Sequence, residues 1–227
     1  MSKKTFYTEV SYLLGVILLA FATALMARAD FGLSMVVAPA YIVHVKIAEI
    51  ASWFTFGMAE YCLQAVLLVL LGIILKRFRA LYFFSFVTAV FYGIVLDLSN
   101  ILVGFIPGDG IAVRIVFFVS GMVICAFSIS LLFHTYIAPE AYELIVKEIA
   151  AKFNYNISKV KTIYDCTSCI ISIILSFALF GFGKFVGINV GTIVCALLNG
   201  VIIGFFSKVL EKHYNFKDCF KFADKFK

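Results

Sequence analysis

Long apolar runs alternate with short polar segments along this chain, and six of the runs are long enough to cross a membrane. A spanning helix needs about 20 mostly apolar residues, because the hydrocarbon core is about 30 Å thick and each helical residue rises about 1.5 Å. With a few residues of slack at each end, the predicted spans cover residues 9–27, 57–75, 81–106, 112–133, 161–182 and 187–208. The pattern therefore predicts an all-α transmembrane protein.

The first predicted span is repeated in the fourth. Residues 15–26, with the sequence GVILLAFATALM, align with residues 121–132, GMVICAFSISLL. Further matches keep the same order in the two halves: Pro39 with Pro139, residues 60–61 with 164–165, and residues 91–93 with 198–200. Each unit holds three spans, and an odd number forces the second copy to insert upside down. We therefore predict two inverted three-helix repeats.

These repeats cover residues 1–109 and 110–207, and a basic amphipathic tail of residues 208–227 follows them. Phe216, Phe220 and Phe226 fall on one helical face of this tail, which suits an interfacial helix on anionic lipid. A frayed basic tail is the alternative that the sequence leaves open.

Each repeat also contains a short segment led by a proline. Proline fits the first turn of a helix, where its missing N–H has no partner to lose. Short helices are therefore expected from Pro39 toward Ile50 and from Pro139 toward Phe153. Neither is long enough to span a bilayer, so each lies in the interface or is re-entrant. A re-entrant helix would bring its partly positive N-terminus inward, which suits an anionic substrate.

Composition supports a membrane protein: 63% of the 227 residues are hydrophobic, 14% are charged and the mean hydropathy is +1.07. Six spans place all but four of the 19 lysines and arginines on one side, the exceptions being Arg28, Lys46, Arg114 and Lys184. Positive loops stay in the cytoplasm, so both termini are predicted to be cytoplasmic. The net charge of +6 then reflects topology and requires no nucleic acid. The first span is expected to be retained rather than cleaved as a leader, because it is long and has an internal copy.

Three acids stand out within the predicted spans: Glu60, Asp97 and Asp165. A charged group in hydrocarbon is unfavourable by several kcal/mol, so such an acid usually faces a cavity or a partner. Glu60 and Asp97 are expected to converge on one site and couple transport to protons or cations. For Glu60 and Asp165 the alternative is an acid in the first turns of a helix that complements the helix dipole.

Neutral polar side chains complete the candidate pathway. Gln64 lies one turn from Glu60, while Tyr92 and Asn199 add polar groups to the third and sixth spans. Asp97 has no acidic counterpart in the second repeat, so function is sought there first. The predicted substrate or ion pathway is therefore Asp97, Glu60, Gln64, Asp165, Tyr92 and Asn199.

No motif in the sequence indicates an enzyme, a cofactor or a metal site. The chain contains no Walker A loop, no H-E-x-x-H, no G-x-S-x-G and no dinucleotide-binding fingerprint. Cys166 and Cys169 have C-x-x-C spacing, but no second pair or nearby histidine completes a zinc set. The cysteines are therefore expected to pack between helices.

Several short motifs resemble those of the YczE/YitT-like bacterial membrane proteins, and the likeness covers nearly the whole chain. They are Gly32-Leu-Ser34, Ala38-Pro-Ala-Tyr41, Phe54-Thr-Phe-Gly57, Glu60-Tyr61 with Gln64, Ser85-Phe-Val-Thr-Ala89, Tyr92-Gly93, Leu96-Asp97 and Ala138-Pro-Glu-Ala-Tyr142. The resemblance implies a six-helix protein of the bacterial inner membrane, and it implies no substrate, reaction or functional residue.

The sequence favours a secondary transporter of a small solute, with proton coupling as a further step. One alternative is a substrate-binding subunit of an energy-coupling-factor importer, with Ala20 and Ala24 of the first span as a docking face. Another is a non-transporting scaffold or sensor. A polar cavity between spans two, three, five and six would favour transport. The expected partners are the lipid bilayer and a small molecule or ion; a homodimer is left open.

Overall fold

The computed structural model describes residues 4–76, 78, 80–107, 110–155 and 157–219. Within them the elements follow the order β1 (Lys4–Tyr7), α1 (Thr8–Ala29), α2 (Ala38–Ala48), α3 (Phe56–Leu75), α4 (Ala80–Gly104), α5 (Ile111–Phe133), α6 (Ala141–Phe153), α7 (Ile157–Phe180), α8 (Val190–His213) and β2 (Tyr214–Lys217). Six helices are long and apolar enough to span a membrane. They are α1, α3, α4, α5, α7 and α8, as the sequence predicts, although α8 extends five residues beyond residue 208.

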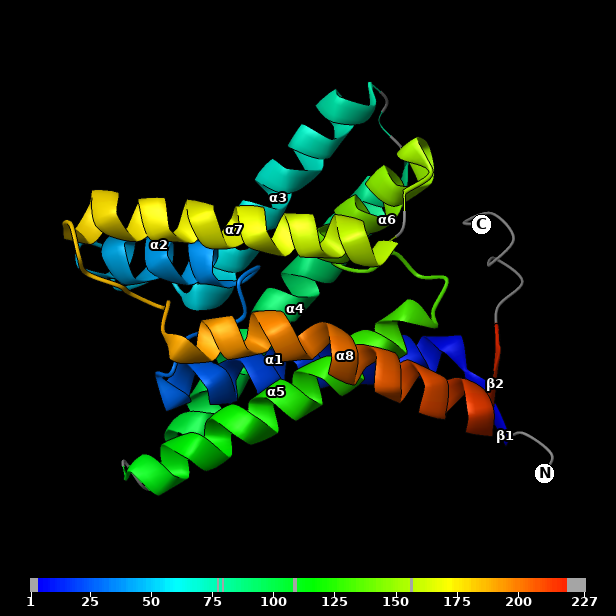
Figure 1. Cartoon of the computed structure of the whole chain (residues 1–227), viewed down its shortest axis with the longest axis horizontal. Helices are drawn as coiled ribbons and strands as arrows, with labels where there is room; N and C mark the ends of the chain where they lie inside the picture. Colours follow the sequence, from blue (N-terminus) through cyan, green and yellow to red (C-terminus); the bar gives the residue numbers. More distant parts are fainter. Residues whose placement is uncertain (1–3, 77, 79, 108–109, 156, 220–227) are drawn as a thin grey trace.

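Helices α1 and α5 cross at the centre of the molecule, and glycines allow their close approach (Figure 1). A Cβ at Gly15 would lie 2.8 Å from Leu132 Cγ and 3.3 Å from the Ser128 carbonyl oxygen. A Cβ at Gly121 would lie 2.7 Å from Met26 Cγ and 2.9 Å from the Ala22 carbonyl oxygen. Each helix therefore has a glycine where the other helix packs too closely for a larger side chain.

The remaining helices form related pairs around this crossing. Helix α4 packs on α1, and α8 packs on α5. The two short helices each pack on both α3 and α7. In addition α3 packs closely on α4. Among the described residues, α7 and α8 do not pack on each other in the way that α3 packs on α4. Both helices are largely exposed along their length.

The two short helices enter the bundle with their N-terminal ends. Ala38, Pro39 and Ala40 at the start of α2 are buried, whereas Glu49 and Ile50 beyond its end are exposed. Helix α6 shows the same gradient, with residues 141–146 buried and residues 151–153 exposed. Pro39 occupies the first turn of α2 as predicted, whereas Pro139 precedes α6, which begins at Ala141.

Each short helix lies alongside a span of the other half and runs in the same direction. The start of α6 contacts α3 through Gln64, and its end contacts α3 where Lys152 Nζ donates to the Ile74 carbonyl oxygen (3.2 Å). The segment before α2 accepts a hydrogen bond from Ser168 of α7, and Lys46 near the end of α2 lies over the Phe180 ring of α7. Figure 1 shows α2 beside α7.

The two ends of the chain meet in a small parallel sheet. Strand β1 pairs with β2 in the register Phe6 with Phe216, and the rings of these residues pack edge to face. Residues 214–217 are therefore extended rather than helical, which corrects the prediction of a helix through this part of the tail. Residues 220–227 of the predicted tail lie outside the described residues. Strands β1 and β2 thus lie side by side (Figure 1).

Candidate functional site

The start of α6 is held in the bundle by hydrogen bonds to its backbone. Ser85 Oγ and Thr88 Oγ1 of α4 donate to the carbonyl oxygens of Pro139 (2.6 Å) and Ala138 (3.0 Å). The backbone N–H of Ala141 donates to Gln64 Oε1 of α3 (3.0 Å). Buried backbone groups need such partners, so three side chains fix the N-terminus of α6 between α3 and α4.

Three carboxyl groups meet at this helix start. Glu60 of α3 is 0% exposed, and Glu140 and Glu143 are 2% and 3% exposed. The Tyr142 hydroxyl donates to Glu60 Oε2 (2.8 Å), and Gln64 Nε2 donates to Glu140 Oε2 (3.0 Å). One oxygen of each acid, Glu60 Oε1, Glu140 Oε1 and Glu143 Oε2, is buried and accepts no hydrogen bond from the described residues. Buried polar atoms are nearly always paired, so these oxygens mark places where a partner belongs.

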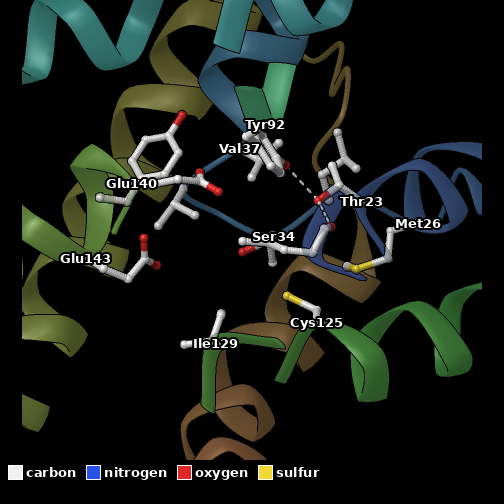
Figure 2. Close-up of a pocket in the computed structure, with 13 residues that line it drawn as sticks. Thr23, Met26, Ser34, Val37, Tyr92, Cys125, Ile129, Glu140 and Glu143 are labelled. Carbon is white, nitrogen blue, oxygen red and sulfur yellow. Dashed lines mark hydrogen bonds between the residues drawn. The ribbon is translucent and has the colours of Figure 1, made fainter. Parts of the chain in front are cut away.

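Glu140 and Glu143 line a small cavity of ≈ 20 Å³ at the crossing of α1 and α5 (Figure 2). Its other walls come from α1, α4, α5, α6 and the segment before α2. The residues that form them are Leu19, Thr23, Met26, Leu33, Ser34, Val36, Val37, Tyr92, Cys125, Ile129 and Tyr142. A cavity needs about 10–15 Å³ to hold a water molecule, so this one has room for about one small particle. A polar cavity between spans two, three, five and six was the observation that would favour transport; of those spans, only the third, α4, lines this cavity.

Burial governs the protonation of these acids. It raises the pKa of Glu140 well above its usual value, and the neighbouring Glu143 and Glu60 raise it further. Burial also raises the pKa of Glu143, whereas the nearby Lys161 opposes this effect. The pKa of Lys147, one turn beyond Glu143, is lowered by burial. A carboxyl group in such a setting binds a proton readily, since removal of the proton leaves a charge away from water.

The profile of a family of unknown function, DUF6198, matches residues 6–208 of the chain. The chain belongs to this family. No curated protein matches the chain, and no solved structure matches it. The match names no YczE/YitT-like relative, so the resemblance to those proteins stays a prediction.

In this DUF6198 protein three of the sequence-predicted residues lie at the cavity or beside it. Glu60 and Gln64 bind residues at the start of α6, as described above. Tyr92 lines the cavity, is 1% exposed, and donates from its hydroxyl to Thr23 Oγ1 (2.9 Å). These three residues come from α3 and α4, and α6 brings their acidic neighbours to them.

Asp97 lies elsewhere and has a structural role. Its Oδ1 accepts the backbone N–H of Gly57 (2.9 Å), and its Oδ2 accepts the hydroxyl hydrogen of Thr55 (2.6 Å). Thr55 is the N-cap of α3, so Asp97 binds free donors at the start of that helix. The expected convergence with Glu60 is therefore wrong, because Glu60 faces α6 while Asp97 caps α3.

The remaining two predicted residues also lie outside the cavity lining. Asp165 of α7 forms an ion pair with Lys161, one turn away (3.1 Å). Asn199 of α8 has a buried Oδ1 that accepts no hydrogen bond from the described part of the chain. Neither residue lines the cavity, although Asp165 lies near enough to Glu143 to act on it electrostatically.

The sequence reasoning missed Glu140 and Glu143. Acids in the first turn of a short helix are usually read as favourable surface charges near the positive end of the helix dipole. One signal was available: Glu140, Tyr142 and Glu143 directly follow a proline, in a segment that the repeat aligns with the apolar start of the other short helix. Within the described residues, no three His, Cys, Asp or Glu side chains form a group that could hold a metal ion.

Proposed function

We propose that this integral membrane protein is a secondary transporter of a small solute, and that buried carboxyl groups at the start of α6 couple transport to protons. The observation that carries the proposal is the pair of unpartnered oxygens, Glu140 Oε1 and Glu143 Oε2, in a cavity at the centre of the bundle. A buried ionisable group in a membrane protein is unfavourable, and it commonly marks an ion or substrate pathway.

An inverted repeat supports alternating access. The aligned residues Gly15 and Gly121 make matching contacts, the first with Leu132 and the second with Met26, and these two partners align with each other as well. Gln64 and Ser168 also align in the repeat, and each binds backbone at or just before the start of the other half's short helix. Two halves with the same contacts can exchange conformations, and so open a shared site to either side.

The proposed mechanism treats α2 and α6 as re-entrant helices. Both insert their N-terminal ends, and the residues at or before these ends line the cavity through Ser34, Val37, Glu140 and Glu143 (Figure 2). A helix N-terminus carries partial positive charge and free N–H groups. Here the start of α6 also carries two carboxyl groups, so its charge suits a cation or proton better than the anion considered from the sequence.

The contacts on either side of the cavity fit a closed, intermediate state of such a transporter. On one side, the backbone N–H of Leu33 donates to Gly187 and that of Gly191 donates to Phe31 (3.0 and 2.8 Å). On the other side, the Tyr136 hydroxyl donates to Glu9 Oε1 (3.0 Å). In the proposed mechanism, opening toward one side breaks the set of hydrogen bonds on that side and leaves the other set in place.

The proposal includes the orientation expected from the positive charges. Both ends of the chain would lie in the cytoplasm, the membrane would be the bacterial inner membrane, and the Leu33–Gly187 contacts would close the outer side. The pairing of β1 with β2 supports a common side for the two ends, because residues in register lie within hydrogen-bonding distance.

The alternatives have less support. Ala20 and Ala24 were the expected docking face of an importer subunit, but they are 0% and 1% exposed and belong to the core. A scaffold or sensor would be expected to have a packed interior, whereas this interior holds a cavity with unpartnered carboxyl oxygens.

Cysteine accessibility tests the proposal directly. Cys125 lines the cavity and is 5% exposed, whereas Cys195 of α8 is 3% exposed and does not line it. Two single-cysteine variants, with the other native cysteines replaced by serine, provide a matched pair. A membrane-impermeant maleimide added to either face of oriented vesicles should label Cys125 from both sides and Cys195 from neither.

Two results would overturn alternating access. Labelling of Cys125 from one side only would indicate a one-sided binding site, as expected for an importer subunit or a sensor. Protection of Cys125 from both sides would indicate a closed structural core. Glu143→Gln in the Cys125 variant is expected to leave two-sided labelling in place, since it changes the ion site and not the opening of either side.

A further inference from the structure

We propose that the cavity at Glu140 and Glu143 binds a small monovalent cation in exchange for a proton, so that the solute of the proposed transporter is itself a cation. This inference rests on the proposed function and specifies the substrate class of the same site.

Two carboxyl oxygens are available to a ligand in the cavity. Glu140 and Glu143 are one helical turn apart on α6, and Figure 2 shows both carboxyl groups on the same side of the cavity. Gln64 satisfies the other oxygen of Glu140 through a hydrogen bond, which leaves Glu140 Oε1 free. Glu143 Oε2 is free as well. A buried carboxylate oxygen needs a proton, a hydrogen-bond donor or a cation.

The described residues supply no cation at the cavity itself. None of the side chains that line it is a lysine, arginine or histidine. Lys161 acts on Glu143 from α7, but its amino group is already paired with Asp165 (3.1 Å). Lys147 lies over the Phe133 ring (5.5 Å). The acids around the cavity therefore outnumber the lysines, and a bound cation or proton would balance the difference.

The size of the cavity limits the ligand. A volume of ≈ 20 Å³ accommodates a particle about as large as one water molecule. Sodium, potassium and ammonium ions have this size, whereas a guanidinium or a choline group is too large for a cavity of this volume. The Tyr92 and Tyr142 side chains in its wall and the hydroxyl groups of Thr23 and Ser34 are suitable neutral neighbours for a monovalent cation.

The same wall is unsuited to a divalent ion. Calcium takes six to eight oxygen ligands, and magnesium demands an octahedral set and keeps several waters. The cavity has room for about one small particle, two free carboxylate oxygens and a few hydroxyl groups, one of which already binds Tyr92. Within the described residues no three His, Cys, Asp or Glu side chains converge on one point.

Proton exchange balances the charge. When the cation enters, one carboxylic O–H bond of Glu140 or Glu143 breaks, the proton leaves to water, and the resulting carboxylate binds the cation. No oxidant or other reactant is needed. The raised pKa of Glu140 supports this exchange, because it keeps the carboxyl group protonated until a cation replaces the proton.

Several ionisable or polar groups face the two carboxyls from the elements packed around them. They come from α1, α3, α4, α5, α6 and α7 and are Tyr12, Glu60, Gln64, Tyr92, Cys125, Tyr142, Lys147, Lys161, Tyr164 and Asp165. Glu60 is the other buried acid at the helix start and raises the pKa of Glu140. Glu60 Oε1 is also buried and accepts no hydrogen bond from the described residues, but the Glu60 carboxyl group lies outside the cavity wall, so we assign the exchange to Glu140 and Glu143.

Thermal stabilisation of the purified full chain in detergent tests the inference. The chlorides of sodium, potassium, ammonium and magnesium are titrated against choline chloride of the same ionic strength, at several pH values. At least one monovalent cation is expected to raise the unfolding temperature. Its apparent affinity should weaken by roughly ten-fold for each unit of acidification, as displacement of one proton requires.

Matched variants assign the site. Glu140→Gln and Glu143→Gln each imitate the protonated side chain, and each is expected to weaken the cation effect by roughly ten-fold or more, as the loss of one charged contact implies. Glu49→Gln, which changes an exposed carboxyl beyond the end of α2, should leave the effect unchanged. If a glutamine variant fails to fold, the pH dependence of the apparent cation affinity of the unaltered chain still shows whether the cation displaces a proton.

Three results would overturn the inference. They are the absence of stabilisation by every monovalent cation, stabilisation by magnesium alone, and an apparent affinity that is independent of pH. The labelling of Cys125 is independent of these measurements. Two-sided labelling of Cys125 without cation binding would support the transporter proposal and contradict a cation as its solute. Cation binding with one-sided labelling would contradict alternating access.

Discussion

Gly15 of α1 lies against Leu132 of α5, close enough that a Cβ on the glycine would lie 2.8 Å from Leu132 Cγ. The aligned pair makes a matching contact with the helices exchanged: Gly121 of α5 lies against Met26 of α1. In the proposed inverted repeat these two contacts correspond to each other, and the carboxyl-lined cavity lies where α1 and α5 cross. This correspondence supports the proposal that the two halves can alternate around one site.

Replacement of Gly121 by alanine should destabilise the protein. Its Cβ would lie 2.9 Å from the backbone carbonyl oxygen of Ala22, which cannot rotate away, so the crossing must widen. Overpacking of this kind usually destabilises by about 1–3 kcal/mol. In Gly200→Ala, the matched control in α8, the new Cβ meets nothing within 4 Å, and the variant should gain about 0.5–1 kcal/mol from helix propensity. Unfolding temperatures in detergent compare the two; equal shifts would contradict a close crossing at Gly121.

Asp97 should affect stability more than transport. Its carboxylate accepts hydrogen bonds from Gly57 N–H and the Thr55 hydroxyl at the start of α3. Loss of a helix cap is worth about 0.5–2 kcal/mol, so Asp97→Ala should lower the free energy of unfolding by that amount, and Asp97→Asn by less. Flux per folded molecule should remain near that of the unaltered chain. A folded Asp97→Asn protein without flux would return Asp97 to the mechanism.

Stability should fall as the pH rises. Folding raises the pKa of Glu140 and Glu143 above 4.5, the ordinary value of glutamate, so the folded protein binds protons more tightly than the unfolded chain. The resulting stabilisation is complete below that ordinary value and is lost as the pH rises through the raised pKa of each group, by up to about 1.4 kcal/mol per pH unit and group.

Unfolding temperatures measured in choline chloride, across mildly acidic to mildly alkaline buffers, check this slope. Glu140→Gln should flatten it, because glutamine does not titrate. Glu49→Gln is the control and should retain the slope. A Glu140→Gln protein with an undiminished slope would show that other groups are responsible.

The two ends of the chain should be open to cross-linking. Thr5 and Asn215 are register partners in the parallel pair β1–β2. Neighbouring strands bring Cα atoms within the range of a disulfide, so Thr5→Cys with Asn215→Cys should cross-link under oxidation, in a chain with Cys219 replaced by serine. Thr5→Cys with Lys184→Cys, which the charge pattern assigns to opposite faces, should not. Cross-linking of the second pair within one chain would contradict the proposed topology.

The sequence predicts the spans well because their signal is strong. An apolar run of spanning length has few alternatives, so six helices could be located to within a few residues, apart from the C-terminal end of α8. The secondary structure of the tail was harder to predict. Its helical spacing of phenylalanines suggested a helix, whereas tertiary pairing of Phe216 with Phe6 makes residues 214–217 a strand.

The site was only partly predictable, since burial is not visible in local sequence. Glu60 and Gln64 stood out as polar groups in an apolar span, and both lie at the start of α6. Glu140 and Glu143 lie in a segment too short and too polar to be read as buried, and only the insertion of α6 between α3, α4 and α7 removes them from water. Asp97 stood out because it lies deep in an apolar span, but its structural partners at the start of α3 could not be seen in the sequence.

Proton movement driven by a cation gradient tests the central claim most directly. Proteoliposomes that contain the full chain and an internal pH dye are diluted from choline chloride into sodium or potassium chloride. The account predicts that the interior becomes alkaline as cations enter and protons leave, that Glu140→Gln abolishes the change, and that Asp97→Asn retains it. An interior pH that does not respond to either cation, or a Glu140→Gln protein that responds like the unaltered chain, would contradict the account.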